Sequence, residues 1–118
     1  MIVLGIDPGI KNLGWGVVSG YKNRLEHLDS GVFCPQGNNL GDKLLEINNF
    51  SKGLIERFTP DAVAIESVFV QKNVRNTLRL GEVRAAVILA CAFSRIPCSD
   101  CAPREVKKNI TGNGNSTK

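Results

Sequence analysis

The N-terminal segment constrains the fold most, because it is an apolar run that ends in a carboxylate. Residues 1–9 read Met-Ile-Val-Leu-Gly-Ile-Asp-Pro-Gly. Apolar, β-branched runs of this length are typical of buried strands. Strands disfavour Asp, and Pro8 has no N–H to donate to a sheet ladder, so the strand must end at Asp7. We therefore expect Asp7 at the rim of a sheet, where the functional residues of parallel sheets usually lie.

A second segment repeats this arrangement. Residues 61–66 read Asp-Ala-Val-Ala-Ile-Glu and deliver Glu66 at the end of another short apolar run. If the two strands are parallel neighbours they lie roughly 4.8 Å apart, so Asp7 and Glu66 would face each other as like charges. Such a pair needs a cation or a shared proton. The alternative is that each acid only caps the loop or helix that follows it.

The residues between the two acids predict how the strands connect. Residues 13–18 and 25–33 are strand-like and flank a hairpin tip at 21–23, so with the first strand they predict an antiparallel meander. Residues 40–58 then have a helical apolar period, with Asn38 or Asn39 as the cap. A strand–helix–strand order predicts a crossover, and hence the parallel pairing that the two acids require.

A second helix is expected over residues 74–94. Lys72, Arg75 and Arg79 follow three- and four-residue spacings, so they form one basic ridge if the helix begins that early. Residues 85–93 are apolar on every side of the helix and must therefore be covered on every side. We expect one face to pack on the sheet and the other on a second copy of the protein, with burial inside the same chain as the alternative.

Positive charge is concentrated in the second half of the chain. Residues 1–66 carry six Lys and Arg against eight Asp and Glu, a net charge of −2, whereas residues 67–118 carry nine against three, a net charge of +6. A basic half beside paired acids indicates a polyanionic partner held near a metal site. The alternative is a solvated basic surface.

The remaining composition is that of one ordinary globular domain of 118 residues. We expect a cytoplasmic protein without a membrane partner, because no apolar run is long enough to span a bilayer and the N-terminus lacks the pattern of a signal peptide. Cys34, Cys91, Cys98 and Cys101 are then expected to be free thiols. The Cys98 and Cys101 spacing occurs in zinc and redox sites, but no second cysteine pair or histidine cluster completes such a site.

Four motifs, in this order, resemble the RuvC-type Holliday junction resolvases of the ribonuclease H-like superfamily. They are residues 5–9 with 13–16, residues 64–69, residues 80–84 and residues 103–118, so the resemblance covers the whole chain. It implies an α/β fold with a mixed five-stranded sheet flanked by helices. It also implies a homodimeric endonuclease that cuts four-way DNA junctions in two symmetric strands during recombination and repair. In the family, a branch-migration helicase complex is a further partner.

The resemblance also assigns roles to residues. It implies that Asp7 and Glu66 are catalytic acids that bind magnesium or manganese, that Phe69 contacts the junction, and that Lys107 and Lys118 lie near the scissile phosphate. The family uses four carboxylates, and the other two lie on a further helix beyond the last residue of this sequence. The chain is therefore interpreted as a single nuclease domain, residues 1–118, that is truncated before its C-terminal helix.

Physical chemistry agrees with phosphodiester hydrolysis. Two divalent ions roughly 3.5–4 Å apart activate a water and stabilise the leaving oxygen of an in-line displacement. Hard carboxylate ligands favour magnesium over zinc. In this interpretation Asp7 bridges or anchors the ions, Glu66 holds the ion next to the attacking water, and the ridge of Lys72, Arg75 and Arg79 binds the DNA backbone.

Two other functions compete with this interpretation. One is a non-catalytic module that only binds junctions. The other is an actin-like or sugar-kinase-like ATP-binding domain, which opens with a similar strand and an Asp-x-Gly turn. That superfamily needs a second, duplicated domain, for which 118 residues leave no room.

Overall fold

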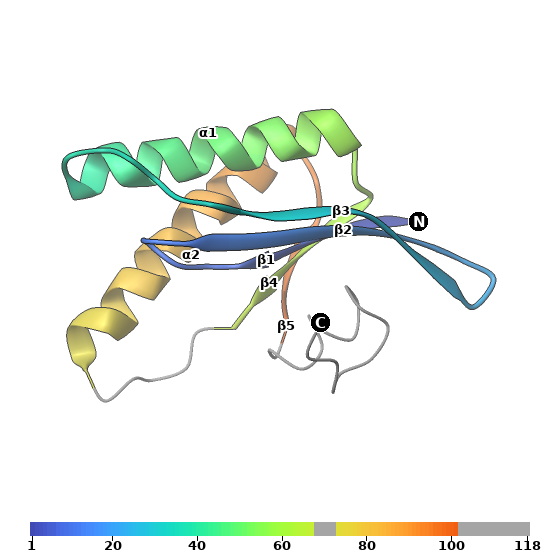
Figure 1. Cartoon of the computed structure of the whole chain (residues 1–118), viewed down its shortest axis with the longest axis horizontal. Helices are drawn as coiled ribbons and strands as arrows, with labels where there is room; N and C mark the ends of the chain where they lie inside the picture. The colour runs from blue at the N-terminus through green and yellow to red at the C-terminus, as the bar shows by residue number, and fades with distance from the viewer. Residues whose placement is uncertain (68–72, 102–118) are drawn as a thin grey trace.

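The computed structural model describes residues 1–67 and 73–101, with the side chain of Cys101 left out, as an α/β unit built on one mixed sheet. Figure 1 shows helices α1 and α2 together on one side of the sheet. The five strands run in the order β3-β2-β1-β4-β5, so the expected five-stranded sheet flanked by helices is confirmed. The elements are β1 (Ile2–Asp7), β2 (Leu13–Tyr21), β3 (Arg24–Phe33), α1 (Leu40–Phe58), β4 (Ala62–Glu66), α2 (Val74–Ser94) and β5 (Cys98–Cys101).

Strand β1 lies at the centre and joins the two kinds of pairing. It is antiparallel to β2 and parallel to β4, which confirms the expected meander and crossover. Lys22 and Asn23 close the hairpin with φ angles of 46° and 65°, a left-handed turn that matches the twist of the flanking strands. β2 is longer than the expected 13–18, because its pairing with β3 continues past a register shift to Tyr21.

Helix α1 begins and ends where its sequence predicts. The Asn39 side chain accepts a hydrogen bond of 2.8 Å from the backbone N–H of Asp42, so Asn39 is the cap. Thr59 adopts a left-handed conformation, with φ 43°, and its N–H returns to the carbonyl of Ile55. Pro60 follows directly, and a residue before proline avoids the helical region.

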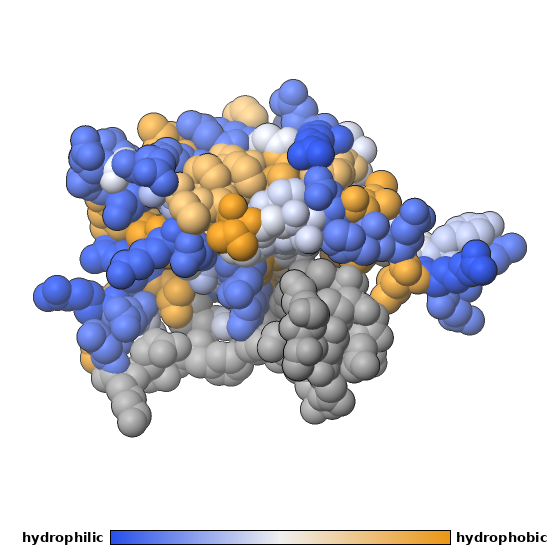
Figure 2. All heavy atoms as spheres, in the orientation of Figure 1, coloured by the Kyte–Doolittle hydropathy of each residue, from blue (hydrophilic) through white to orange (hydrophobic). Residues whose placement is uncertain are grey.

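The core fills the space between the sheet and the two helices. Trp15 of β2 contacts the rings of Phe50 and Phe58 on α1, and Phe33 stacks on Phe50 with ring centroids 4.2 Å apart. On the face seen in Figure 2, apolar residues gather where α1 meets the sheet, whereas the protruding end of the β2–β3 hairpin is mostly hydrophilic. The largest fully buried apolar side chains are Leu4, Ile6, Leu13, Ile47, Ile65, Val17, Val63, Val83 and Val87.

Helix α2 begins at Val74, with Asn73 as its cap. The expected ridge of Lys72, Arg75 and Arg79 is therefore wrong as a continuous helical feature, because Lys72 precedes the helix and lies outside the described residues. The Asn73 side chain, which accepts from the N–H of Arg75, starts the helix after Lys72.

The second half of α2 is buried on one face only. Ala86, Val87 and Ala90 are buried in the core, but Leu89 is 64% exposed and Phe93 is 73% exposed. Within the described ranges, the rest of the chain therefore does not cover the outer face of residues 85–93. Neither described helix is long and apolar enough to cross a membrane.

Candidate functional site

Asp7 and Glu66 lie at the carboxyl ends of neighbouring parallel strands. The pairing of Ile6 with Ile65 makes Asp7 and Glu66 the next residues along two neighbouring strands, and such strands lie about 4.8 Å apart. Ile6 and Ile65 point into the core, and successive strand residues point to opposite faces. The structure therefore brings the two acids together, as the sequence predicts, on the face of the sheet opposite α1 and α2.

Gly14 leaves room for the Asp7 carboxylate. It pairs with Asp7 across the β1–β2 ladder, and a Cβ added there would lie 3.5 Å from the Cβ and 3.9 Å from the Oδ2 of Asp7. A larger side chain would extend into the space beside the carboxylate. The sequence signal was a glycine inside a strand, which often marks a close approach.

The turn after Asp7 also depends on one glycine. A Cβ on Gly9 would lie 2.3 Å from the backbone oxygen of Asn12, a contact that no side chain can make. The Asn12 side chain in turn accepts a hydrogen bond of 3.1 Å from the Cys34 thiol. The chain that flanks Asp7 is thus held by a close backbone approach and by a link to the residue after β3.

Behind the two acids, an ion pair ties α2 to the edge strand. Arg84 of α2 pairs with Asp100 of β5, which is opposite Ile65 in the β4–β5 register. The Arg84 side chain is only 17% exposed. Sequence reasoning missed this pair. The available signal was that Arg84 directly precedes a long apolar helical run, because an arginine that is buried beside such a run needs a charged partner.

The structure describes only two of the remaining predicted site residues, Arg75 and Arg79. Phe69, Lys72, Lys107 and Lys118 lie outside the described residues. Arg75 is exposed on the first turn of α2. Arg79 forms a 2.7 Å ion pair with Glu82.

The two carboxylates alone do not complete a metal site. Among the residues that the structure describes, no group of three or more His, Cys, Asp or Glu side chains lies close enough to hold a metal ion. Asp7 and Glu66 supply hard oxygen donors of the kind that magnesium and manganese prefer, so their chemistry fits these ions.

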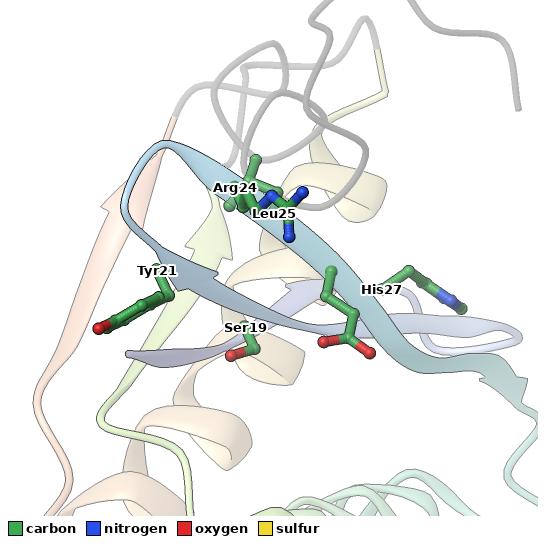
Figure 3. Close-up of a pocket in the computed structure, with 6 residues that line it drawn as sticks. Ser19, Tyr21, Arg24, Leu25 and His27 are labelled. Atoms are coloured by element: carbon green, nitrogen blue, oxygen red, sulfur yellow. The ribbon is translucent and has the colours of Figure 1, made fainter.

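A separate hollow of about 630 Å³ lies along the β2–β3 hairpin. It is at the opposite end of β2 from Gly14, and hence away from Asp7. Its side chains do not converge, because Tyr21 and His27 point in opposite directions (Figure 3). This hollow therefore lacks the arrangement of a catalytic centre.

Comparison with known proteins agrees with this geometry. The family model of the crossover junction endodeoxyribonuclease RuvC matches residues 3–118. The RuvC of Ruegeria pomeroyi is 41% identical over 118 residues, which are 100% of this chain and 72% of that protein. The structure of Thermus thermophilus RuvC has 29% identity and a TM-score of 0.79, over 100% of this chain and 74% of that chain.

A second Thermus structure shares the fold. T. thermophilus RuvC in complex with a Holliday junction substrate has 24% identity and a TM-score of 0.82, over 100% of this chain and 84% of that chain. The family model and the Ruegeria relative support a nuclease over the ATP-binding alternative. The chain belongs to the RuvC family of crossover junction endodeoxyribonucleases.

Proposed function

We propose that this protein is a structure-specific endonuclease that resolves four-way DNA junctions by metal-dependent phosphodiester hydrolysis. One observation carries the proposal: Asp7 and Glu66 end neighbouring parallel strands and point to the same face, in a chain of the RuvC family. Membership of the family supports the substrate, and the paired acids support the reaction.

Asp7 and Glu66 would hold magnesium or manganese, with two ions per site. The ions, when bound, activate a water and stabilise the leaving oxygen. The two acids are half of the four carboxylates that the family resemblance implies. Their role in this chain is to bind the ions from adjacent strands of a rigid sheet, with Gly14 keeping the space beside Asp7 open.

The DNA would be held by aromatic and basic residues downstream of Glu66. Phe69 would stack on a base that is unpaired at the junction centre, which contributes roughly 1–3 kcal/mol. Lys72 and Arg75 would contact phosphates of the backbone, and Lys107 and Lys118 would stabilise charge at the scissile phosphate. Arg79 would join them only by leaving Glu82, its partner in the free protein.

The protein would act as a homodimer through the outer face of α2. Leu89 and Phe93 are largely exposed, and they border a groove of about 800 Å³ between α1 and α2. A second copy would remove this apolar surface from water, and two sites related by symmetry suit two symmetric cuts. A branch-migration helicase complex and a cytoplasmic location remain expectations from the family and from the sequence.

Replacing Asp7 with Asn tests the function. We expect Asp7→Asn, in the protein expressed from its full reading frame, to lower junction cleavage by more than about 100-fold, because a lost metal ligand costs more than a lost supporting contact. Junction binding should stay within a few-fold, since the basic residues remain. Cleavage is measured on gels with magnesium, and binding by fluorescence anisotropy.

Asp29→Asn is the matched control, because Asp29 lies on β3, away from the two acids, where it pairs with Arg57 and accepts a hydrogen bond from the backbone N–H of Ser30. It should cleave like the wild type. Cleavage by Asp7→Asn at the wild-type rate would overturn the assignment of the site. A wild-type protein that binds junctions tightly but never cuts them would favour the non-catalytic alternative.

A further inference from the structure

Two cysteines lie against each other where α2 meets β5. Cys91 is 1% exposed, and Cys98 packs against the same core cluster. Their side chains interact with each other, and both are free thiols. Backbone bonds fix the connection between them, since the N–H of Ile96 bonds to the carbonyl of Cys91 and the N–H of Val63 bonds to the carbonyl of Pro97.

Arg84 places a positive charge beside Cys98. One end of its guanidinium pairs with Asp100, while its Nε atom is buried and has no hydrogen-bond partner in the part of the chain that the structure describes. A buried donor without a partner is costly and calls for an acceptor. An anion at Cys98 would give this cation a second partner.

The two thiols are unequal. The hydrogen bond from Cys91 lowers the pKa of Cys98, and the charge of Arg84 lowers it further against the effect of burial. The same hydrogen bond, together with burial, raises the pKa of Cys91. The lowered pKa increases the thiolate fraction of Cys98, which is the reactive form, whereas the raised pKa keeps Cys91 protonated.

We propose that Cys98 and Cys91 form an oxidation site, at which a peroxide converts the two thiols into a disulfide that links α2 to β5. In the first step the Cys98 thiolate attacks one peroxide oxygen, the O–O bond breaks, and a sulfenic acid and hydroxide form. In the second step the Cys91 sulfur attacks the Cys98 sulfur, the S–S bond forms, and the hydroxyl leaves as water with the Cys91 proton. Two thiols are oxidised and one hydrogen peroxide is reduced to two waters.

The disulfide would act on the edge of the sheet next to the candidate site. β5 pairs with β4 up to Glu66, so a covalent link from α2 would restrain the strand beside that acid. Disulfides are rare inside cells, and those that form there are usually transient and serve catalysis or redox sensing.

Oxidation of the full 118-residue chain tests the proposal. The reduced protein is treated with one equivalent of hydrogen peroxide, blocked with an alkylating agent, and mapped by mass spectrometry without reduction. We expect a peptide pair joined between Cys91 and Cys98, with Cys34 alkylated as in the untreated protein. Cys34 is the internal control because it is exposed and lies away from Arg84.

Variants separate the two steps. Cys91→Ser should stop at a sulfenic acid on Cys98 that dimedone traps, and Cys98→Ser should form no link. Arg84→Gln should slow the oxidation, because it removes a positive charge that lowers the pKa of Cys98 and so increases its thiolate fraction. A disulfide to Cys34 or Cys101 instead, or equal oxidation rates at Cys34 and Cys98, would overturn the proposal. The mapping of the wild-type chain gives this answer even if a variant fails to fold.

Discussion

The Gly14 position is a single-residue test of the space beside Asp7. A Cβ at Gly14 meets Asp7 at ordinary contact distances of 3.5 and 3.9 Å, so Gly14→Ala should cleave junctions within a few-fold of the wild type. Gly14→Val adds methyl groups beside the carboxylate, and we expect it to lower cleavage roughly 10–100-fold. The melting temperature should hold, because β-branched residues favour strands. Gly20→Val, elsewhere on β2 and near only the flexible end of Leu25 and the carbonyl of Arg24, is the control and should cleave normally.

Helix α1 depends on the cap that its sequence predicts. Asn39→Ala removes the acceptor for the N–H of Asp42 and should lower the free energy of unfolding by about 1 kcal/mol. For a domain of this size the melting temperature should fall by roughly 4–8 °C. Asn49→Ala, at an exposed position inside α1, is the matched control and should cause no loss, because alanine is the better helix former. Equal melting temperatures for the two variants in calorimetry would show that the cap contributes nothing.

At the scale of the whole molecule, the proposed homodimer depends on the outer face of α2. Leu89→Glu would place an unpaired charge in the proposed dimer interface, so we expect at least about 100-fold weaker self-association, since such burial costs several kcal/mol. Sedimentation velocity over a concentration series measures it. Leu25→Glu is the control. Leu25 is exposed to a similar extent as Leu89, 53% against 64%, but it lies on the β2–β3 hairpin, outside the proposed interface. A wild-type protein that stays monomeric at high concentration would contradict the dimer.

The sequence by itself determined the elements, their order and the pair of acids. Apolar periods of two and 3.6 residues depend only on neighbours along the chain, so they predicted β1 to β4 and both helices to within a few residues. The crossover order then required β1 and β4 to be parallel, which placed Asp7 beside Glu66. The ridge through Lys72 required the helix to begin early enough to include Lys72, but Asn73 is the cap and α2 begins at Val74.

Only the tertiary structure decided which side chains meet across elements. The contact of Gly14 with Asp7 depends on the strand register, and the meeting of Arg84 with Asp100 and of Cys91 with Cys98 depends on how α2 is rotated over β5. These partners are separated in the sequence, and no periodic pattern encodes the rotation of a helix against an edge strand. It results from packing the whole core at once, since close-packed interiors accept few relative placements of their elements.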